Sequence, residues 1–162
     1  MDHATSSDIT DLLEVYRDSL KHAYNVGKID WPNPITMAFM EYLLKTNELY
    51  AFRLDPKIVA AARLSHQPDE RIWTDAPPLA LYLGKLATSE EVRGTDYFRR
   101  RMLPSIQEYA GANTPLRLDC LSDNERLKSH YHRLGFISLG NVTFFSEKQD
   151  IDLTVTRYER RP

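Results

Sequence analysis

The chain has 162 residues, 42% of them hydrophobic and 27% charged, and its 21 Lys and Arg residues nearly balance 23 Asp and Glu residues. This composition predicts one soluble globular domain over residues 1–162. The net charge of −2 argues against a nucleic-acid partner, and no apolar run approaches the ~20 residues of a membrane span. The single cysteine, Cys120, excludes an internal disulfide framework, so a cytoplasmic location is expected.

The first third of the chain predicts two helices. The apolar residues after Ser7 and Asp8 follow helical spacing, so these two residues are expected to cap a first helix. Gly27 and the Trp-Pro-Asn-Pro stretch at 31–34 are expected to end it. A second helix is predicted from Thr36 to Lys45. Its inner face is expected to carry Phe39, Leu43 and Leu44.

Strands are predicted next. The segments 49–54 and 57–65 flank the turn residues Asp55 and Pro56, which is typical of a hairpin. The polar stretch from His66 to Pro78 is predicted to be a long loop. The nearly continuous apolar run from Leu79 to Thr88 predicts a central strand covered on both faces.

The rest of the chain alternates helices and strands. An apolar stripe from Tyr97 to Ala110 predicts a helix, with a kink or break at 100–103 because Pro104 lies inside it. A strand at 116–120 precedes a helix that Ser122 and Glu125 are expected to start as a capping box and that Gly135 ends. The last strands are predicted from Phe136 to about Ser146 and from Ile151 to Glu159. The fold class is therefore α/β, a mixed sheet with helices on its faces.

Several segments together are similar to the GNAT superfamily of acyl-CoA-dependent N-acyltransferases. They are Leu81–Thr88, Arg93-Gly94, Leu116–Cys120, Asn124 and the run Tyr131-His132-Arg133-Leu134-Gly135-Phe136. The resemblance covers almost the whole chain. It implies a central mixed, mostly antiparallel sheet of about six to seven strands with a splayed parallel pair, flanked by about four helices. It also implies that the strand before the first helix is reduced to a few residues.

The resemblance further implies the activity and the substrates. Members of this superfamily transfer an acetyl group from acetyl-CoA to a primary amine by direct transfer, so a small-molecule or peptide amine is the expected acceptor. A homodimer is a further expectation. The backbone of Leu86, Ala87 and Thr88 would bind the pantetheine arm. The residues expected around the pyrophosphate and the rest of the cofactor are Arg93, Gly94, Thr95, Asp96, Tyr97, Phe98, Arg99 and Asn124.

The expected pyrophosphate loop departs from the family pattern of Arg or Gln, two residues, Gly, one residue, then Gly or Ala. When its first residue is aligned on Arg93, Asp96 and Phe98 stand at the two small positions. A carboxylate at Asp96 would cap the following helix and repel a phosphate. The nearby arginines, Arg93 and those at 99–101, either compensate through bidentate phosphate contacts or form a solvated face.

Tyr131 is the first catalytic candidate. In the family, a tyrosine at this place after an Asn such as Asn124 returns a proton to the leaving thiolate. A phenol with a pKa near 10 is protonated at neutral pH and suits that role. Its helical spacing with Leu127 and Leu134 by itself favours a core tyrosine, and the context of Asn124 and Gly135-Phe136 reverses that preference toward catalysis.

No general base stands out. Tyr82, Lys85, His66 and Asp119 are candidates by location, although Asp119 is expected to pair with Arg117 or cap a turn. Cys120 is interpreted as a small buried hydrophobe. Four aromatic residues either line an acceptor pocket or belong to a core or an interface: Trp31, Trp73, Tyr24 and Phe39.

Two alternatives to the acetyl-CoA enzyme remain open. Asp96 and Phe98 are compatible with a noncatalytic module of the same fold that has lost pyrophosphate binding and serves in binding or regulation. The arginines are compatible with a different acyl donor that lacks the CoA pyrophosphate, such as a carrier-protein thioester.

Overall fold

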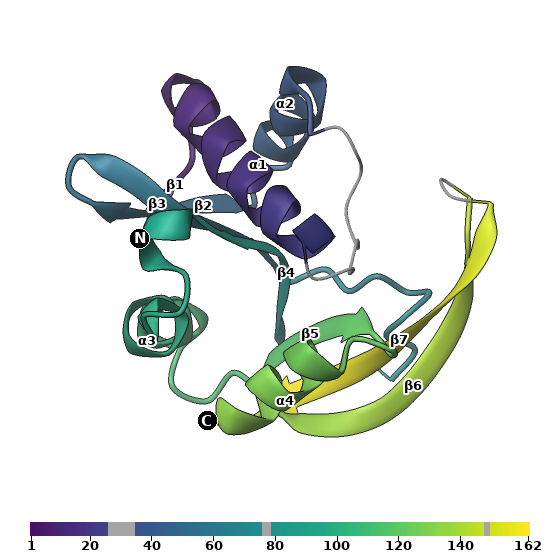
Figure 1. Cartoon of the computed structure of the whole chain (residues 1–162). Helices are drawn as coiled ribbons and strands as arrows, with labels where there is room; N and C mark the ends of the chain where they lie inside the picture. Colours follow the sequence, from purple (N-terminus) through teal and green to yellow (C-terminus); the bar gives the residue numbers. More distant parts are fainter. Residues whose placement is uncertain (26–34, 76–78, 148–149) are drawn as a thin grey trace. The chain divides into compact units, whose positions relative to one another are not determined.

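The computed structural model describes residues 1–25, 35–75, 79–147 and 150–162 (Figure 1). The chain divides into two compact units: unit 1 comprises residues 1–64 and 83–106, and unit 2 comprises residues 65–82 and 107–162. Gly27 and the stretch 31–34, expected to end the first helix, lie outside the described residues.

The described residues form seven strands. They are β1 (Asp2–His3), β2 (Leu49–Leu54), β3 (Lys57–Ser65), β4 (Leu81–Thr88), β5 (Leu116–Leu121), β6 (Ile137–Ser146) and β7 (Ile151–Arg160). Their hydrogen-bonded order is β1-β2-β3-β4-β5-β7-β6. The β1–β2, β2–β3, β5–β7 and β6–β7 pairs are antiparallel. Strands β4 and β5 are parallel, with Leu81 paired to Leu116 and Tyr82 to Arg117.

The described residues also form four α-helices: α1 (Ile9–Asn25), α2 (Met37–Lys45), α3 (Leu103–Ala110) and α4 (Glu125–Arg133). The predicted mixed, mostly antiparallel sheet of six to seven strands with four helices is confirmed. The reduced first strand is confirmed as well, since β1 has two residues. No helix in the described part of the chain has both the length and the apolar character that crossing a bilayer requires.

Unit 1 begins with a capping box. Thr5 donates its backbone N–H and its hydroxyl to Asp8 Oδ2, at 2.9 and 3.0 Å, before a short 3-10 turn (Ser6–Asp8) that leads into α1. The predicted cap at Ser7 and Asp8 is therefore wrong in detail, because the cap is Thr5 and Asp8 reaches back to it. Arg53 of β2 donates to Asp8 Oδ1 at 2.7 Å.

This carboxylate predicts an acid-sensitive contribution to stability. Burial alone raises the pKa of Asp8, but hydrogen bonds from Arg53 and Thr5 outweigh it and hold the pKa below its ordinary value. The stabilisation is therefore complete above the ordinary pKa near 4 and is lost as the pH falls through the folded-state value. Asp8→Asn is expected to lower the free energy of unfolding by about 1–2 kcal/mol at pH 7.

Urea unfolding at a series of pH values checks this expectation. The gap between the wild type and Asp8→Asn should narrow in acid, and a gap that does not depend on pH would contradict the assignment. Asp2→Asn is the matched control, because Asp2 is exposed and lies 3.9 Å from the same Arg53. It is expected to change the free energy of unfolding by less than about 0.5 kcal/mol.

The core of unit 1 joins α1 and α2 to the sheet. Buried side chains of α1, such as Leu12 and Tyr16, belong to one cluster with Met40 of α2 and with Leu49 and Ile58 of the strands. Figure 1 shows α1 and α2 lying side by side. Thr36 caps α2 by accepting from the N–H of Phe39. The predicted inner face of α2 is confirmed, since Leu43 is buried and Phe39 and Leu44 pack, half-buried, against the same core. The buried Met40 belongs to this face as well.

The helix after β4 breaks where Pro104 predicts. Residues Phe98–Met102 form a π-helical turn in which the N–H of Leu103 donates to the carbonyl of Phe98, and α3 follows directly. Proline lacks an N–H and crowds the carbonyl four residues earlier, which the wider turn accommodates.

Unit 2 contains β5, the long β6–β7 hairpin and α4, which lies against this part of the sheet (Figure 1). Gly135 ends α4 with φ 84°, as predicted for a left-handed residue after a helix. Ile72 and Trp73 lie in the long loop but are buried in a cluster with Ala80, Tyr82 and Val155. That loop is therefore anchored to the sheet of unit 2 by two large apolar side chains.

Candidate functional site

Helix α1 holds the backbone of β4 at Lys85 and at Thr88, which is the last of the three residues expected to contact pantetheine. Ser19 Oγ donates to the carbonyl of Thr88 at 2.9 Å and accepts the N–H of the same residue, also at 2.9 Å. Tyr16 Oη donates to the carbonyl of Lys85 at 2.8 Å, where β4 has a left-handed residue with φ 50°. Neither contact is visible in the sequence, because the helix and the strand are far apart in the chain.

The loop after β4 has two residues in the left-handed region that glycine favours, Gly94 and Asp96. Gly94 has φ 80° and Asp96 has φ 64°, and Asp is one of the few residues other than glycine that tolerate this region. Asp96 therefore stands where the aligned pattern requires Gly. A Cβ at Gly94 would meet no atom within 4 Å, so the backbone there faces open space.

The charge of Asp96 is balanced locally. Arg99 donates its Nε to Asp96 Oδ2 at 3.1 Å and its Nη2 to the same oxygen, and Arg100 Nε lies 3.8 Å away. The N-cap position of the following π-helical turn is Tyr97, and the Asp96 carboxylate binds Arg99, so the predicted cap at Asp96 is not confirmed. Arg93 Nη2 donates to the carbonyl of Thr88 at 2.9 Å, which ties the loop to β4.

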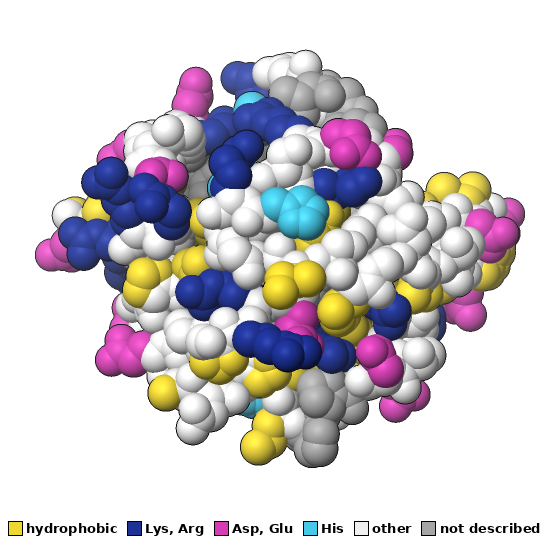
Figure 2. All heavy atoms as spheres, turned by 90° about the horizontal axis from the view of Figure 1, so that it is seen from below, with side chains coloured by type: hydrophobic (Ala, Val, Ile, Leu, Met, Phe, Trp, Pro, Cys, Tyr) yellow, Lys and Arg dark blue, Asp and Glu magenta, His cyan; other side chains and the backbone are white. Residues whose placement is uncertain are grey.

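The other residues expected around the pyrophosphate are Thr95, Tyr97 and Phe98. Thr95 Oγ1 donates to the carbonyl of Val92 at 2.7 Å, and Phe98 is half-buried. Burial raises the pKa of Tyr97 and the charge of Arg101 opposes the rise. On the face shown in Figure 2, basic and acidic side chains are interspersed, without one broad basic surface.

In unit 2, Asn124 starts α4. Its Oδ1 accepts the N–H of Leu127 at 3.2 Å, so Asn124 is the N-cap of the helix. The predicted capping box of Ser122 and Glu125 is wrong, because Glu125 is the first residue of α4 and binds Lys128. Asn satisfies an orphan N–H at a helix start as well as Ser does, which makes the two patterns hard to separate in sequence.

Tyr131 lies on the buried face of α4, two turns after Asn124. Its ring centroid is 5.6 Å from that of Tyr158 of β7 and 6.0 Å from that of Phe136. Tyr131 is 6% exposed. The aromatic contacts fix the direction of the ring, and the core interpretation and the catalytic one both remain compatible with them.

The candidates for a general base are spread over both units. Lys85 lies in unit 1, whereas His66, Tyr82 and Asp119 lie in unit 2. His66 Nδ1 lies 3.2 Å from the carbonyl of Ala80, and Asp119 is half-buried on β5. Cys120 is buried, as expected for a small hydrophobe. No residue of this group is distinguished by its contacts.

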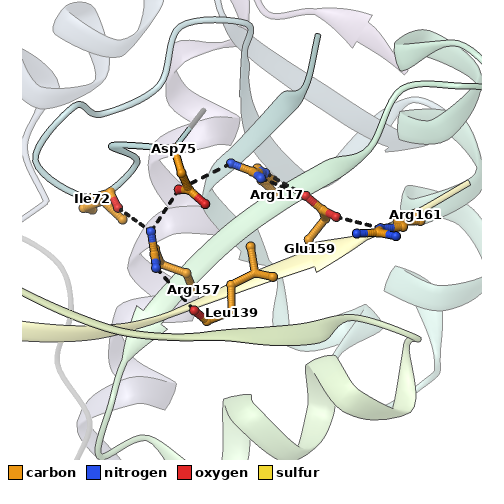
Figure 3. Close-up of polar contacts among 7 residues, drawn as sticks. All are labelled: Ile72, Asp75, Arg117, Leu139, Arg157, Glu159 and Arg161. Atoms are coloured by element: carbon orange, nitrogen blue, oxygen red, sulfur yellow. Dashed lines mark hydrogen bonds and ion pairs between the residues drawn. The ribbon is translucent and has the colours of Figure 1, made fainter. Parts of the chain in front are cut away.

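Sequence reasoning missed a charged cluster in unit 2 (Figure 3). Arg117 donates its Nε and Nη2 to Glu159 Oε2, at 3.0 and 2.9 Å. Arg117 is thus paired with Glu159, a partner that is not visible in the sequence, and the expected pairing or capping role of Asp119 stays a prediction. Glu159 lies directly across the β5–β7 ladder from Arg117, and side chains at paired positions of neighbouring strands lie close together.

The four aromatic candidates for an acceptor pocket do not form one group among the described residues. Trp73 is buried, with its ring centroid 5.4 Å from that of Tyr82 in unit 2. Phe39 is half-buried, and its ring lies edge-on to Tyr16 in unit 1 at 6.4 Å. Trp31 and the side chain of Tyr24 lie outside the described residues.

No protein-family model matches the chain. Among curated proteins, it is similar to an uncharacterized N-acetyltransferase of Bacillus subtilis strain 168, YesJ, with 27% identity over 103 residues. That match covers 60% of this chain and 57% of the relative, so the chain spans little more than half the length of YesJ.

Solved structures of GNAT-family acetyltransferases share the fold over nearly the whole chain. One from Streptococcus agalactiae 2603 superposes with a TM-score of 0.80 at 15% identity, covering 99% of this chain and 94% of that one. One from Listeria monocytogenes 4b F2365 has a TM-score of 0.73 at 19% identity, covering 99% and 93%. A ribosomal-protein-alanine N-acetyltransferase from Brucella melitensis has a TM-score of 0.69 at 15% identity, covering 99% and 98%.

Proposed function

We propose that the chain belongs to the GNAT superfamily and that residues 1–162 form one N-acetyltransferase domain, which its similarity to YesJ and the fold that it shares with solved GNAT-family structures support. The proposed reaction transfers an acetyl group from acetyl-CoA directly to the primary amine of a small molecule or peptide. A cytoplasmic location and a homodimer belong to the same proposal. Acetyl-CoA supplies the acetyl group as an activated thioester, and the residues of this chain bind it and move the proton.

Tyr131 is the proposed acid. Direct transfer joins the amine nitrogen to the acetyl carbon and breaks the carbon–sulfur bond, which leaves a thiolate that needs a proton. A tyrosine hydroxyl is protonated at neutral pH and donates that proton. The observation that carries the proposal is the course of α4, where the N-cap Asn124 and the oriented, buried Tyr131 precede the left-handed Gly135.

The proposed binding residues lie along β4 and the loop after it. The backbone of Leu86, Ala87 and Thr88 would contact the pantetheine arm, with Thr88 held in place by Ser19. The residues from Arg93 to Arg99 would surround the pyrophosphate. The loop fits an anion in two respects: its backbone adopts the glycine-like path at Gly94 and Asp96, and arginine side chains neutralise the carboxylate of Asp96.

Substitutions at Asp96 test the effect of its carboxylate charge and of its left-handed backbone on CoA binding. Asp96→Gly removes the carboxylate, releases Arg99 and Arg100 for phosphate, and relieves the backbone of a left-handed non-glycine residue. It is expected to tighten the binding of CoA by about ten-fold, since one further charge-assisted contact contributes about 1.5 kcal/mol. Calorimetric titration with CoA measures the change.

Asp96→Asn is the matched control, because Asn tolerates the same backbone region without the charge. It is expected to give most of the gain in affinity, whereas an exposed variant elsewhere, Glu108→Gln, should give none. Unchanged or weaker CoA binding in both Asp96 variants would show that this loop does not face the pyrophosphate.

An assay of CoA thiol release tests the proposed function. The full chain is incubated with acetyl-CoA and a panel of small amines and amino-terminal peptides, and the thiol is detected with a chromogenic disulfide. At least one amine is expected to stimulate thiol release above the rate without acceptor, with a matching acetylated product by mass spectrometry. Acetyl-CoA that binds but is not consumed with any amine would contradict the enzyme and favour the noncatalytic module.

The noncatalytic module is the second candidate, and Asp96 and Phe98 are the observations that favour it. A half-buried Phe98 leaves less room than the Gly or Ala of the aligned pattern. If the loop has lost its function, the wild type should not bind CoA, and the double variant Asp96→Gly, Phe98→Gly should acquire binding.

A further inference from the structure

Two arginines of unit 2 converge on one carboxylate (Figure 3). Arg117 on β5 and Arg157 on β7 have side chains that are 6% and 14% exposed. Arg157 Nη1 donates to Asp75 Oδ1 at 3.0 Å, and Arg117 Nη1 lies 4.0 Å from the same oxygen. The position of the Asp75 carboxylate is therefore one where a planar anion meets two guanidinium groups.

An indole fixes both guanidinium groups. The Cζ atoms of Arg117 and Arg157 lie 4.9 and 5.8 Å from the centroid of the Trp73 ring. Trp73 is buried and itself packs against Tyr82. The hydroxyl of Tyr82 lies in the same cluster, and burial raises its pKa although the charge of Arg117 opposes the rise. The arginines are thus held in place before any ligand arrives, which lowers the entropic cost of binding one.

Some N–H donors of these two arginines have no hydrogen-bond acceptor among the described residues. Arg117 gives Nε and Nη2 to Glu159, and Arg157 gives its Nη atoms to Asp75 and to the carbonyls of Ile72 and Leu139. Arg117 Nη1 and Arg157 Nε are buried without a hydrogen bond among the described residues. Buried donors without acceptors are uncommon in folded proteins and indicate a missing partner.

Asp75 differs from its partners in exposure. Its side chain is 58% exposed and comes from the loop before β4, whereas Arg117 is buried and Arg157 is half-buried on strands of the sheet. An ion pair whose carboxylate is exposed contributes little to stability, so a carboxylate from solution competes with it at small cost. Because Asp75 is itself a carboxylate, its contacts show that this group fits between the two arginines.

We propose that Arg117 and Arg157 form a carboxylate-binding site in which Asp75 is displaced by the carboxylate of a ligand. This inference rests on the proposed function, because the ligand is then the acceptor: an amine that also carries a carboxylate, such as an amino acid or a peptide with a nearby acidic terminus. The two arginines hold the carboxylate through charge-assisted hydrogen bonds. Amines without a carboxylate are correspondingly poorer acceptors.

Binding of matched acids and amides tests the site without any acyl donor. Glycine, alanine, phenylalanine, lysine and a dipeptide are each titrated against the full chain beside their C-terminal carboxamides, with affinity read from chemical shifts in NMR. At least one acid is expected to bind about ten-fold or more tightly than its amide. Asp75→Asn is expected to tighten the binding of that acid by about two- to five-fold and to leave the amide unchanged.

Two more variants complete the design. Arg157→Gln is expected to weaken the binding of the acid by about ten-fold. Arg161→Gln should leave this affinity unchanged, because Arg161 is 80% exposed and donates to Oε1 of Glu159, not to the carboxylate of Asp75. The proposed site is overturned if no acid binds at concentrations of tens of millimolar, or if acids and amides bind with equal affinity. It is also overturned if Asp75→Asn leaves the affinity for the acid unchanged. Inorganic phosphate that binds more tightly than every acid would also overturn it.

The two proposals fail in distinguishable ways. A protein that shows selective acid binding but does not bind acetyl-CoA would contradict the proposed function and support the carboxylate site. A protein that acetylates amino acids and their carboxamides with equal kcat/KM, and shows no selective acid binding, would support the function and overturn the site.

Discussion

Tyr131→Phe is expected to lower kcat for acetyl transfer by about a hundred-fold or more, because it deletes the hydroxyl that protonates the leaving thiolate. KM for acetyl-CoA is expected to stay within about two-fold, since the ring and its contacts with Tyr158 and Phe136 are retained. The free energy of unfolding should change little for the same reason. Steady-state kinetics with a saturating amine and calorimetric binding of acetyl-CoA measure the two effects separately.

Tyr158→Phe is the matched control. Tyr158 is fully buried, its ring adjoins that of Tyr131, and its Oη has no hydrogen bond among the described residues. Removing that hydroxyl is therefore expected to leave kcat and stability nearly unchanged. An unchanged kcat in Tyr131→Phe, or an equal loss in both variants, would remove Tyr131 from the mechanism.

Glu159→Gln is expected to lower the free energy of unfolding by about 3 kcal/mol at pH 7, because it leaves the buried guanidinium of Arg117 without its carboxylate. Burial alone raises the pKa of Glu159, but hydrogen bonds from Arg161 and Arg117 outweigh it and hold the pKa below its ordinary value. The stabilisation is therefore complete above the ordinary pKa near 4.3 and is lost as the pH falls through the folded-state value.

Urea unfolding at neutral and acidic pH measures this effect, and the two proteins should converge in acid. Replacing both partners, Arg117→Leu with Glu159→Leu, is expected to recover much of the loss, because apolar residues then fill the site without a buried charge. Arg161→Gln should change the free energy of unfolding by less than about 0.5 kcal/mol. A loss below about 1 kcal/mol in Glu159→Gln would show that this pair does not stabilise the fold.

Local patterns predict the elements of this chain well. Apolar periodicity locates α1, α2 and the strands, and Pro104 locates the break before α3. The run from Asn124 to Phe136 predicts the helix that carries Tyr131, because its spacing determines which residues share a helix face. The caps are less predictable, since Thr5 and Asn124 compete with Ser7 and Ser122 for the same role and a shift of one or two residues decides between them.

Contacts between distant segments are not visible in the sequence. Asp75, Arg117 and Arg157 are separated by tens of residues, and they meet because β5 and β7 are neighbours in the sheet and Trp73 anchors the loop that carries Asp75. The support of Thr88 by Ser19 is a contact of the same kind. At Asp96, the sequence predicts a conflict of charge, whereas its neutralisation by Arg99 and Arg100 depends on the left-handed turn that brings them together.

Calorimetric titration of the wild-type chain with acetyl-CoA measures whether the chain binds the proposed acyl donor. Saturable binding of one acetyl-CoA per chain is expected, with a Kd of about 1–100 μM, together with weaker binding of pantetheine fragments that lack the pyrophosphate. No heat of binding at acetyl-CoA concentrations up to about 1 mM would contradict the proposal that this chain is an acetyl-CoA-dependent enzyme.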